Sequence, residues 1–153
     1  MDANQPILIH VAVHLGATLR KRWQRFTVPY PVTSGPGGVL CRQDTGRPVP
    51  EQDKVPVDYT GCAALLQLRA KHGGPVVLEF STAPTEQQGS LTLDASGWVE
   101  MALSAAQTAS LPYGAKANQW KDAFGGMHIT FGNGDVFRHF DVALRLDSGS
   151  HCA

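Results

Sequence analysis

Apolar and polar residues alternate along most of the chain, which is the pattern of half-buried β-strands. The clearest run is Cys62–Arg69, in which every second residue is apolar and Gln67 and Arg69 fall on the opposite face. A second alternating run, 75–81, follows a turn that contains Gly73 and Gly74. The two runs are predicted to pair as an antiparallel hairpin.

The same pattern predicts further strand pairs. Residues 91–93 and 99–103 flank a Ser96-Gly97 turn, and 127–131 and 136–146 flank Asn133-Gly134, for which we predict a two-residue type I′ turn. Opening strands over 6–13 and 17–26 are expected to form a hairpin around Gly16. Ser104 and Gln107 have the spacing of a capping box, so a short helix is predicted there, ended by Pro112.

The segment 28–55 interrupts this alternation with repeated prolines and glycines. Such a composition disfavours both ladders and helices, so we predict a long, partly mobile loop. A second extended loop is expected over 112–125. The predicted organisation is a single β-sandwich domain over 1–147 that carries the insertion 28–55, followed by a flexible tail, 148–153.

The order of these segments resembles a known family. The motifs that carry the resemblance are, in chain order, Gly16-Ala17-Thr18, Asp58-Tyr59-Thr60-Gly61 leading to Arg69, Ser96-Gly97, Thr108–Pro112, and Asn133-Gly134 leading to Arg138. This order is similar to that of a β-sandwich domain family of tailed-bacteriophage virion proteins, related to long tail fibre attachment domains and upper baseplate N-terminal domains. The insertion and the second loop are additions to it, and we expect them to be docking surfaces particular to this protein.

The resemblance implies an all-β fold, an immunoglobulin-like antiparallel β-sandwich with one short helix. It also implies a non-enzymatic structural role in the tail, baseplate or neck of a virion. The expected partners are other virion proteins and further copies of the chain, and the expected location is the virion, with the host cytoplasm during assembly.

Composition narrows the function classes. The 153 residues include 13 basic and 13 acidic side chains, so no global field attracts a nucleic acid or an anionic membrane, and neither is expected as a partner. The longest apolar runs are about five residues, far below the roughly 20 that span a bilayer. The N-terminus lacks the pattern of a secretory signal. Three cysteines without paired spacing, Cys41, Cys62 and Cys152, are interpreted as free thiols.

Candidate chemistry is sparse. The sequence contains no Gly-x-Ser-x-Gly, His-Glu-x-x-His or phosphate-binding lysine loop, so no catalytic residue and no cofactor is predicted. A two-residue Asn133-Gly134 turn would place His128 across from His139. Asp141, two residues along the same strand, would then be the candidate for a third metal ligand. We interpret these side chains as polar neighbours on a solvated face and predict no metal site. A small metal-dependent β enzyme is kept as an alternative, which metal analysis would test.

Candidate subunit contacts come from the loops and from one strand. Tyr30, Val39 and Leu40 lie in the insertion, and Trp120 lies in the second loop, where aromatic residues often anchor interfaces. Arg20 and Arg22 belong to a basic cluster whose charges divide between the two faces of a strand. That division favours a charged edge or a subunit contact over nucleic-acid binding.

A carbohydrate- or receptor-binding β-sandwich is the main alternative function. Four aromatic residues lie in or beside turns, where a flat ring could stack on a sugar: Tyr30, Trp98, Tyr113 and Trp120. This alternative predicts exposed aromatic residues gathered on one face, whereas the structural role predicts contacts with virion subunits.

Overall fold

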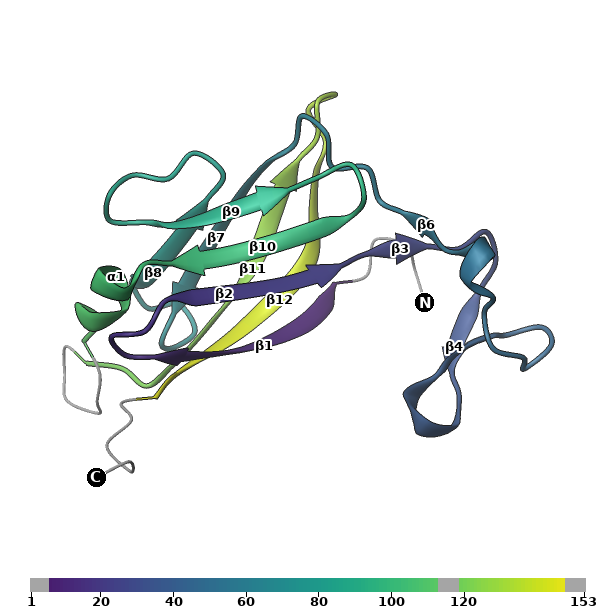
Figure 1. Ribbon diagram of the computed structural model, residues 1–153, viewed down its shortest axis with the longest axis horizontal. Coiled ribbons are helices and arrows are strands. Elements are labelled where there is room, and N and C mark those ends of the chain that lie inside the picture. The colour runs from purple at the N-terminus through teal and green to yellow at the C-terminus, as the bar shows by residue number, and fades with distance from the viewer. Residues whose placement is uncertain (1–5, 113–118, 148–153) are drawn as a thin grey trace.

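The computed structural model describes residues 6–112 and 119–147 and is built almost entirely of β-strands (Figure 1). Eight strands form one sheet: β1 (Ile7–His14), β2 (Leu19–Gln24), β7 (Ala63–Arg69), β8 (Val76–Ser81), β9 (Gly89–Leu93), β10 (Trp98–Leu103), β11 (Asp122–Thr130) and β12 (Val136–Asp147). Their spatial order is β1-β12-β11-β7-β8-β9-β10-β2. The predicted all-β class, with one short helix, is confirmed.

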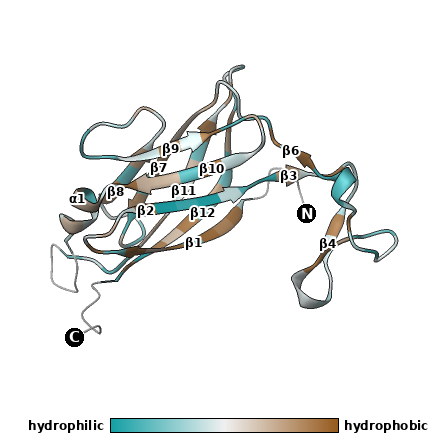
Figure 2. Cartoon of the chain, in the orientation of Figure 1, coloured by the Kyte–Doolittle hydropathy of each residue, from teal (hydrophilic) through white to brown (hydrophobic). Residues whose placement is uncertain are grey.

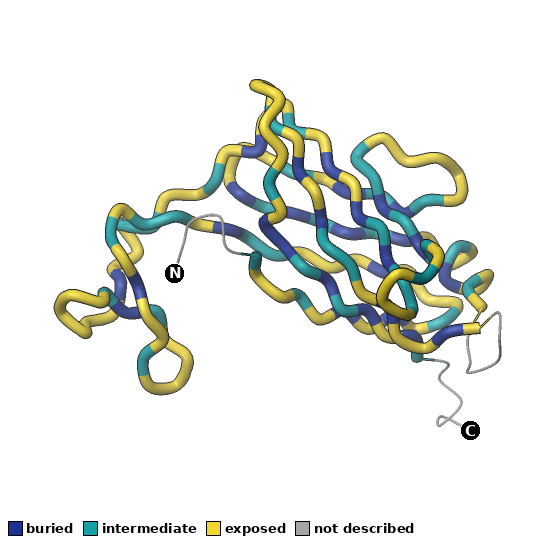
Figure 3. The backbone as a smooth tube through the Cα atoms, turned by 180° about the vertical axis from the view of Figure 1, so that it is seen from behind, coloured by how far each residue is buried: buried dark blue, intermediate teal, exposed yellow. Residues whose placement is uncertain are grey.

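The sheet curls into a nearly closed barrel, because its first and last strands, β1 and β2, lie next to each other. Its two halves face one another across a single core, as the layers of a sandwich do. The alternation in the sequence explains that core, since every second residue of each strand points inward. The core includes Leu66, Phe80, Met101, Met127 and Phe140, all fully buried. Figure 3 shows buried positions recurring along the barrel strands.

Two predicted hairpins and the helix are confirmed. β7 pairs with β8, with Leu66 opposite Phe80, and β9 pairs with β10 around Gly97, whose φ is +81°. Helix α1 (Ala105–Ala109) begins with the predicted capping box: Ser104 accepts a hydrogen bond from the Gln107 N–H, and the Gln107 side chain accepts one from the Ser104 N–H.

The predicted opening hairpin is wrong. β1 pairs in parallel with β12, with Val11 opposite Leu144, and β2 pairs with β10 at the other end of the sheet. The two strands are still joined by a tight turn, in which the Ala17 N–H donates to the His14 carbonyl at 3.0 Å. Pairing with β12 places the apolar inward face of β1 beside the buried Val142, Leu144 and Leu146 of β12. A local sequence pattern does not reveal this partner.

The last hairpin exists, but its predicted turn type is wrong. The Phe131 N–H donates to the Asp135 carbonyl at 2.8 Å, so the loop is Gly132-Asn133-Gly134. Only Gly134 has a positive φ, of +91°. This is the three-residue hairpin loop in which a type I turn is followed by a left-handed glycine. The register shifts again between Met127 and His128, where His139 forms a bulge in β12.

The insertion is more regular than predicted. It forms two short ladders, β3 (Phe26–Thr27) with β6 (Val55–Pro56), and β4 (Val32–Ser34) with β5 (Leu40–Arg42). Two 3₁₀ turns, η1 (Pro36–Gly38) and η2 (Glu51–Asp53), connect them. The glycines and prolines occupy turns and strand ends here, so they shape the ladders instead of blocking them. We call residues 26–56 the arm.

The second predicted loop is shorter than expected, because β11 already begins at Asp122. Part of that loop, 113–118, and the predicted tail, 148–153, lie outside the described residues.

Candidate docking surfaces

The arm projects from one end of the barrel (Figure 1). It has a small interior of its own, in which Val32, Cys41 and Val49 are buried. Two further contacts brace it: the Tyr30 hydroxyl donates to an Asp53 carboxylate oxygen at 2.6 Å, and the Arg42 guanidinium lies 4.0 Å from the centre of the Tyr30 ring. Desolvation and the Asp53 carboxylate raise the pKa of Tyr30. The arm is therefore a folded element.

The predicted contact residues of the arm have different positions. Val39 is 48% exposed at the β4–β5 turn and is available to a partner. Tyr30 is half-buried and contacts Asp53 and Arg42 within the arm, and Leu40 is also half-buried. Exposed apolar side chains also occur at the base of the arm, at Phe26 and Val55.

A hollow of about 350 Å³ lies between the base of the arm and the start of β1. We call it the junction hollow. Its lining is mainly apolar and includes Ile7, Phe26, Val28, Val32 and Leu40, and Lys54 also lines it. It brings together residues from both ends of the arm and from the first strand of the barrel.

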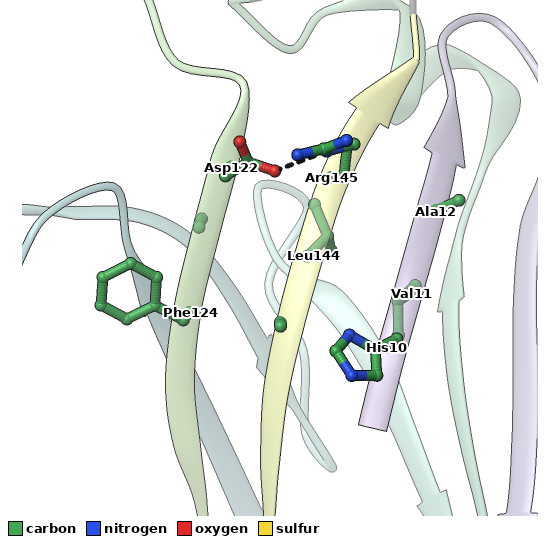
Figure 4. Close-up of a pocket in the computed structure, with 9 residues that line it drawn as sticks. His10, Val11, Ala12, Asp122, Phe124, Leu144 and Arg145 are labelled. Atoms are coloured by element: carbon green, nitrogen blue, oxygen red, sulfur yellow. Dashed lines mark hydrogen bonds and ion pairs between the residues drawn. The ribbon is translucent and has the colours of Figure 1, made fainter. Parts of the chain in front are cut away.

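A second depression, of about 500 Å³, lies on the outer face of β1, β12 and β11 (Figure 4). His10 and Ala12 line it from β1, and Asp122 and Arg145 join across it with 2.8 Å between Oδ1 and Nε. The Phe124 ring extends away from β12 and is 46% exposed. This face thus combines an exposed aromatic ring with an ion pair, and it has room for a neighbouring molecule.

Arg20 and Arg22 lie on one face of β2, as predicted, and both contact Glu100 of β10, at 3.4 and 3.5 Å. The Arg22 guanidinium also covers the Trp98 ring, 4.6 Å from its centre. Ion pairs this exposed contribute at most about 1 kcal/mol to folding, so both arginines can exchange partners at little cost.

Trp120 is not the exposed anchor that its loop position suggested. Only 5% of it is exposed, and it belongs to the barrel core. Its backbone N–H donates to the Pro112 carbonyl at 3.1 Å.

The predicted pairing of His128 with His139 is wrong, because the bulge at His139 changes the direction of that side chain. His128 is exposed, whereas His139 is buried and its Nδ1 lies 2.9 Å from the Tyr59 hydroxyl. The Arg25 guanidinium donates to the His139 carbonyl at 3.0 Å. Burial, together with the Arg25 charge, lowers the pKa of His139 to about 4. The imidazole is therefore neutral at pH 7 and forms part of a buried polar cluster.

Sequence reasoning missed this cluster, because its members are far apart in the chain. Tyr59 was visible only as part of the Asp58-Tyr59-Thr60-Gly61 turn, and the bulge that buries His139 has no local signature. Within the described residues, no group of three or more histidine, cysteine, aspartate or glutamate side chains is arranged to hold a metal ion.

The described thiols are both free. Cys41 is buried in the arm, and Cys62 packs against the barrel core, where desolvation raises its pKa. Cys152 lies outside the described residues.

Several motif residues that carry the family resemblance contact one another. The buried Thr108 hydroxyl accepts a hydrogen bond from the Gly16 N–H at 3.0 Å and donates to the Ala17 carbonyl at 2.9 Å. The Tyr59 N–H donates to the Asp94 carbonyl, beside the Ser96-Gly97 turn. These motifs therefore fasten the connections between strands.

Comparison of the chain with protein-family models gives no match, and comparison with curated proteins gives none either. In the part of the chain that the structure describes, no helix has the length and apolar character needed to cross a membrane.

Proposed function

We propose that this protein is a non-enzymatic structural component of a tailed-phage virion. In this proposal several copies assemble in the tail, baseplate or neck and dock other virion subunits through the arm. The observation that carries the proposal is the arm itself, a braced projection with exposed apolar residues at one end of a stiff barrel. The motif order in the sequence supports the choice of a virion, because it is similar to the order in a domain family of tailed-phage virion proteins.

The arm is suited to docking for a physical reason. Burying the exposed side chains of Phe26, Val39 and Val55 against a neighbour gains about 25 cal/mol for each Å² of apolar surface removed from water. Because Tyr30 and Arg42 already brace the arm, less conformational entropy is lost on docking than a free loop would lose. A preorganised arm can thus hold neighbouring subunits without reshaping the barrel.

The positions of the described aromatic residues do not favour the carbohydrate-binding alternative. Trp120 is in the core, Trp98 is covered by Arg22, and Tyr30 is bonded within the arm. They lie on different parts of the molecule and form no shared platform.

Mass spectrometry of purified phage particles tests the proposal directly, since the chain should be present at a constant ratio to other virion proteins. Cross-linking through lysines then tests the docking role. Lys54, at the base of the arm, should form cross-links to other subunits, while Lys71, in the distant β7–β8 turn, serves as the control. Particles that lack the chain would contradict the virion role, and equal cross-linking at both lysines would contradict docking through the arm.

A further inference from the structure

Among the described residues, the eight-stranded sheet is open between its two terminal strands. β1 and β2 are the terminal strands of the sheet order, and they lie beside each other without pairing. In the described residues, the turn bond between Ala17 and His14 is the backbone link between them. We call the gap between these two edges the seam.

One backbone hydrogen bond at the end of β1 shows which backbone groups of this strand face the seam. The Leu15 N–H donates to the Asp147 carbonyl of β12, so the odd-numbered residues of β1 are bonded to that strand. The N–H and C=O groups of Leu8, His10 and Ala12 therefore point the other way, into the seam. Unpaired groups of this kind are a template for another strand.

The seam opens towards the start of β1. The inward-facing side chains of this strand become steadily more exposed in that direction: Val13 is 0% exposed, Val11 4% and Ile7 38%. The junction hollow lies at this open end and is lined by Ile7 and by Phe26, which follows β2. Figure 1 shows that β1 begins at the end of the barrel where β2 continues into the arm.

The two edges differ in chemistry. β1 is mainly apolar, whereas β2 is mainly hydrophilic (Figure 2). β1 carries neither the charges nor the proline that usually protect an edge strand, whereas β2 carries Arg20, Lys21 and Arg22 in succession. Arg20 and Arg22 share the Glu100 carboxylate, but the exposed Lys21 takes part in none of the ion pairs described. The seam is therefore apolar on one side and positively charged on the other.

We propose that the seam is an acceptor site for an extended peptide segment of a partner protein. The segment adds a strand along the open half of β1, bonded to the backbone of Leu8 and His10. One of its apolar side chains enters the junction hollow, and a carboxylate beside it faces Lys21. The main-chain bonds supply affinity, and the hollow and the lysine supply specificity. The site shares with the arm the hollow that Phe26, Val28 and Lys54 help to line, but it does not depend on the virion assignment.

The test selects binders from a displayed library of random eight-residue peptides against the whole protein. Selected peptides should alternate apolar and polar residues and contain an acidic residue at a fixed place. Replacing that residue with lysine should weaken binding roughly fivefold, the size expected of an exposed charge pair. Lys21→Glu should reverse this preference.

A matched pair of variants tests strand addition itself. Leu8→Pro removes an N–H that faces the seam and leaves the bonds to β12 in place, so peptide binding should be lost while the fold is kept. Leu8→Ala keeps that N–H and should bind the peptide as the unchanged protein does. Hydrogen exchange should show protection of the Leu8 and His10 amides when the selected peptide is bound.

Three results would overturn the proposal. The library could yield no binders, the selected peptides could bind Leu8→Pro undiminished, or the bound peptide could leave those two amides unprotected. Sedimentation covers a further outcome: if the protein alone associates with concentration and protects the same amides, a second copy fills the seam instead of a partner peptide.

Discussion

The barrel and the arm differ in how many side chains they bury. In the barrel, alternation places every second side chain in one large core, and residues such as Leu66 and Met127 are fully buried. In the arm, three buried side chains and a few polar contacts hold short ladders together, and most residues are exposed (Figure 3). The barrel should therefore carry nearly all of the stability, and the arm can vary without endangering the fold.

The largest difference should come from matched core truncations. Leu66→Ala removes a fully buried side chain from the barrel and should lower the free energy of unfolding by about 3 kcal/mol. Val49→Ala in the arm should leave the main transition within about 0.5 kcal/mol of its original value, because the arm can open locally. Urea denaturation of both variants measures this. Equal losses would show that arm and barrel unfold as one unit.

Acid should also act on the barrel, through His139. Its pKa is about 4 in the folded protein, against an ordinary value of 6.5. The unfolded chain therefore binds the proton more tightly, and stability falls as the pH drops from about 6.5 to 4. The full effect of this shift is about 3 kcal/mol. Denaturation at a series of pH values measures it.

His139→Gln is the control for that prediction, since it removes the titrating group. It should be less stable at pH 7, because the contact with Tyr59 is changed, but its stability should depend less on pH in this window. An unchanged pH dependence would assign the acid effect to other groups.

The turn at Gly134 should give a smaller effect. Its φ of +91° is unfavourable for a residue with a side chain, so Gly134→Val should cost about 1 kcal/mol or more. Gly132→Ala, in the same loop, is the control, because Gly132 has no positive φ and a Cβ there meets no atom within 4 Å. Thermal melts of the two variants should differ clearly. Equal melting temperatures would mean that the backbone at Gly134 is not constrained.

The sequence predicted the parts of the fold that depend on neighbours along the chain. The β7–β8 and β9–β10 hairpins and the capping box of Ser104 follow from local alternation and turn residues, and each is confirmed. The partner of β1 was missed, because nothing within residues 7–14 distinguishes β2 from β12 as a neighbour. The bulge in β12 has no signature in the sequence either. Because of it, His139 lies in the interior and not on the surface as predicted.

The candidate surfaces were predictable to a lesser degree. Composition marked the insertion as unusual, and Val39 is indeed exposed there. The same composition concealed its ladders, since proline and glycine are compatible with strands whose turns and ends they occupy. Trp120 shows the opposite failure: a loop position suggested exposure, but the large apolar ring is buried in the nearby core.

Deletion of most of the arm should have the smallest effect on the stability of the barrel. Replacing residues 28–54 by a four-residue turn removes most of the arm but none of the eight barrel strands. The barrel should keep a cooperative melt at nearly its original temperature, because its core residues lie outside the deleted segment. Calorimetry measures the melt, and incorporation into particles measures docking, which should fall sharply.

A single substitution separates the contribution of the arm to docking from its contribution to folding. Val39→Asp changes only an exposed side chain, so folding should be unaffected while docking through the arm weakens, and Thr33→Asp, also exposed in the arm, is the matched control. If the shortened protein fails to fold, the arm contributes to the barrel and the separation drawn between the two regions is wrong. If it folds and still enters particles normally, the barrel surface makes the contacts, and the outer face around Phe124 becomes the region to mutate.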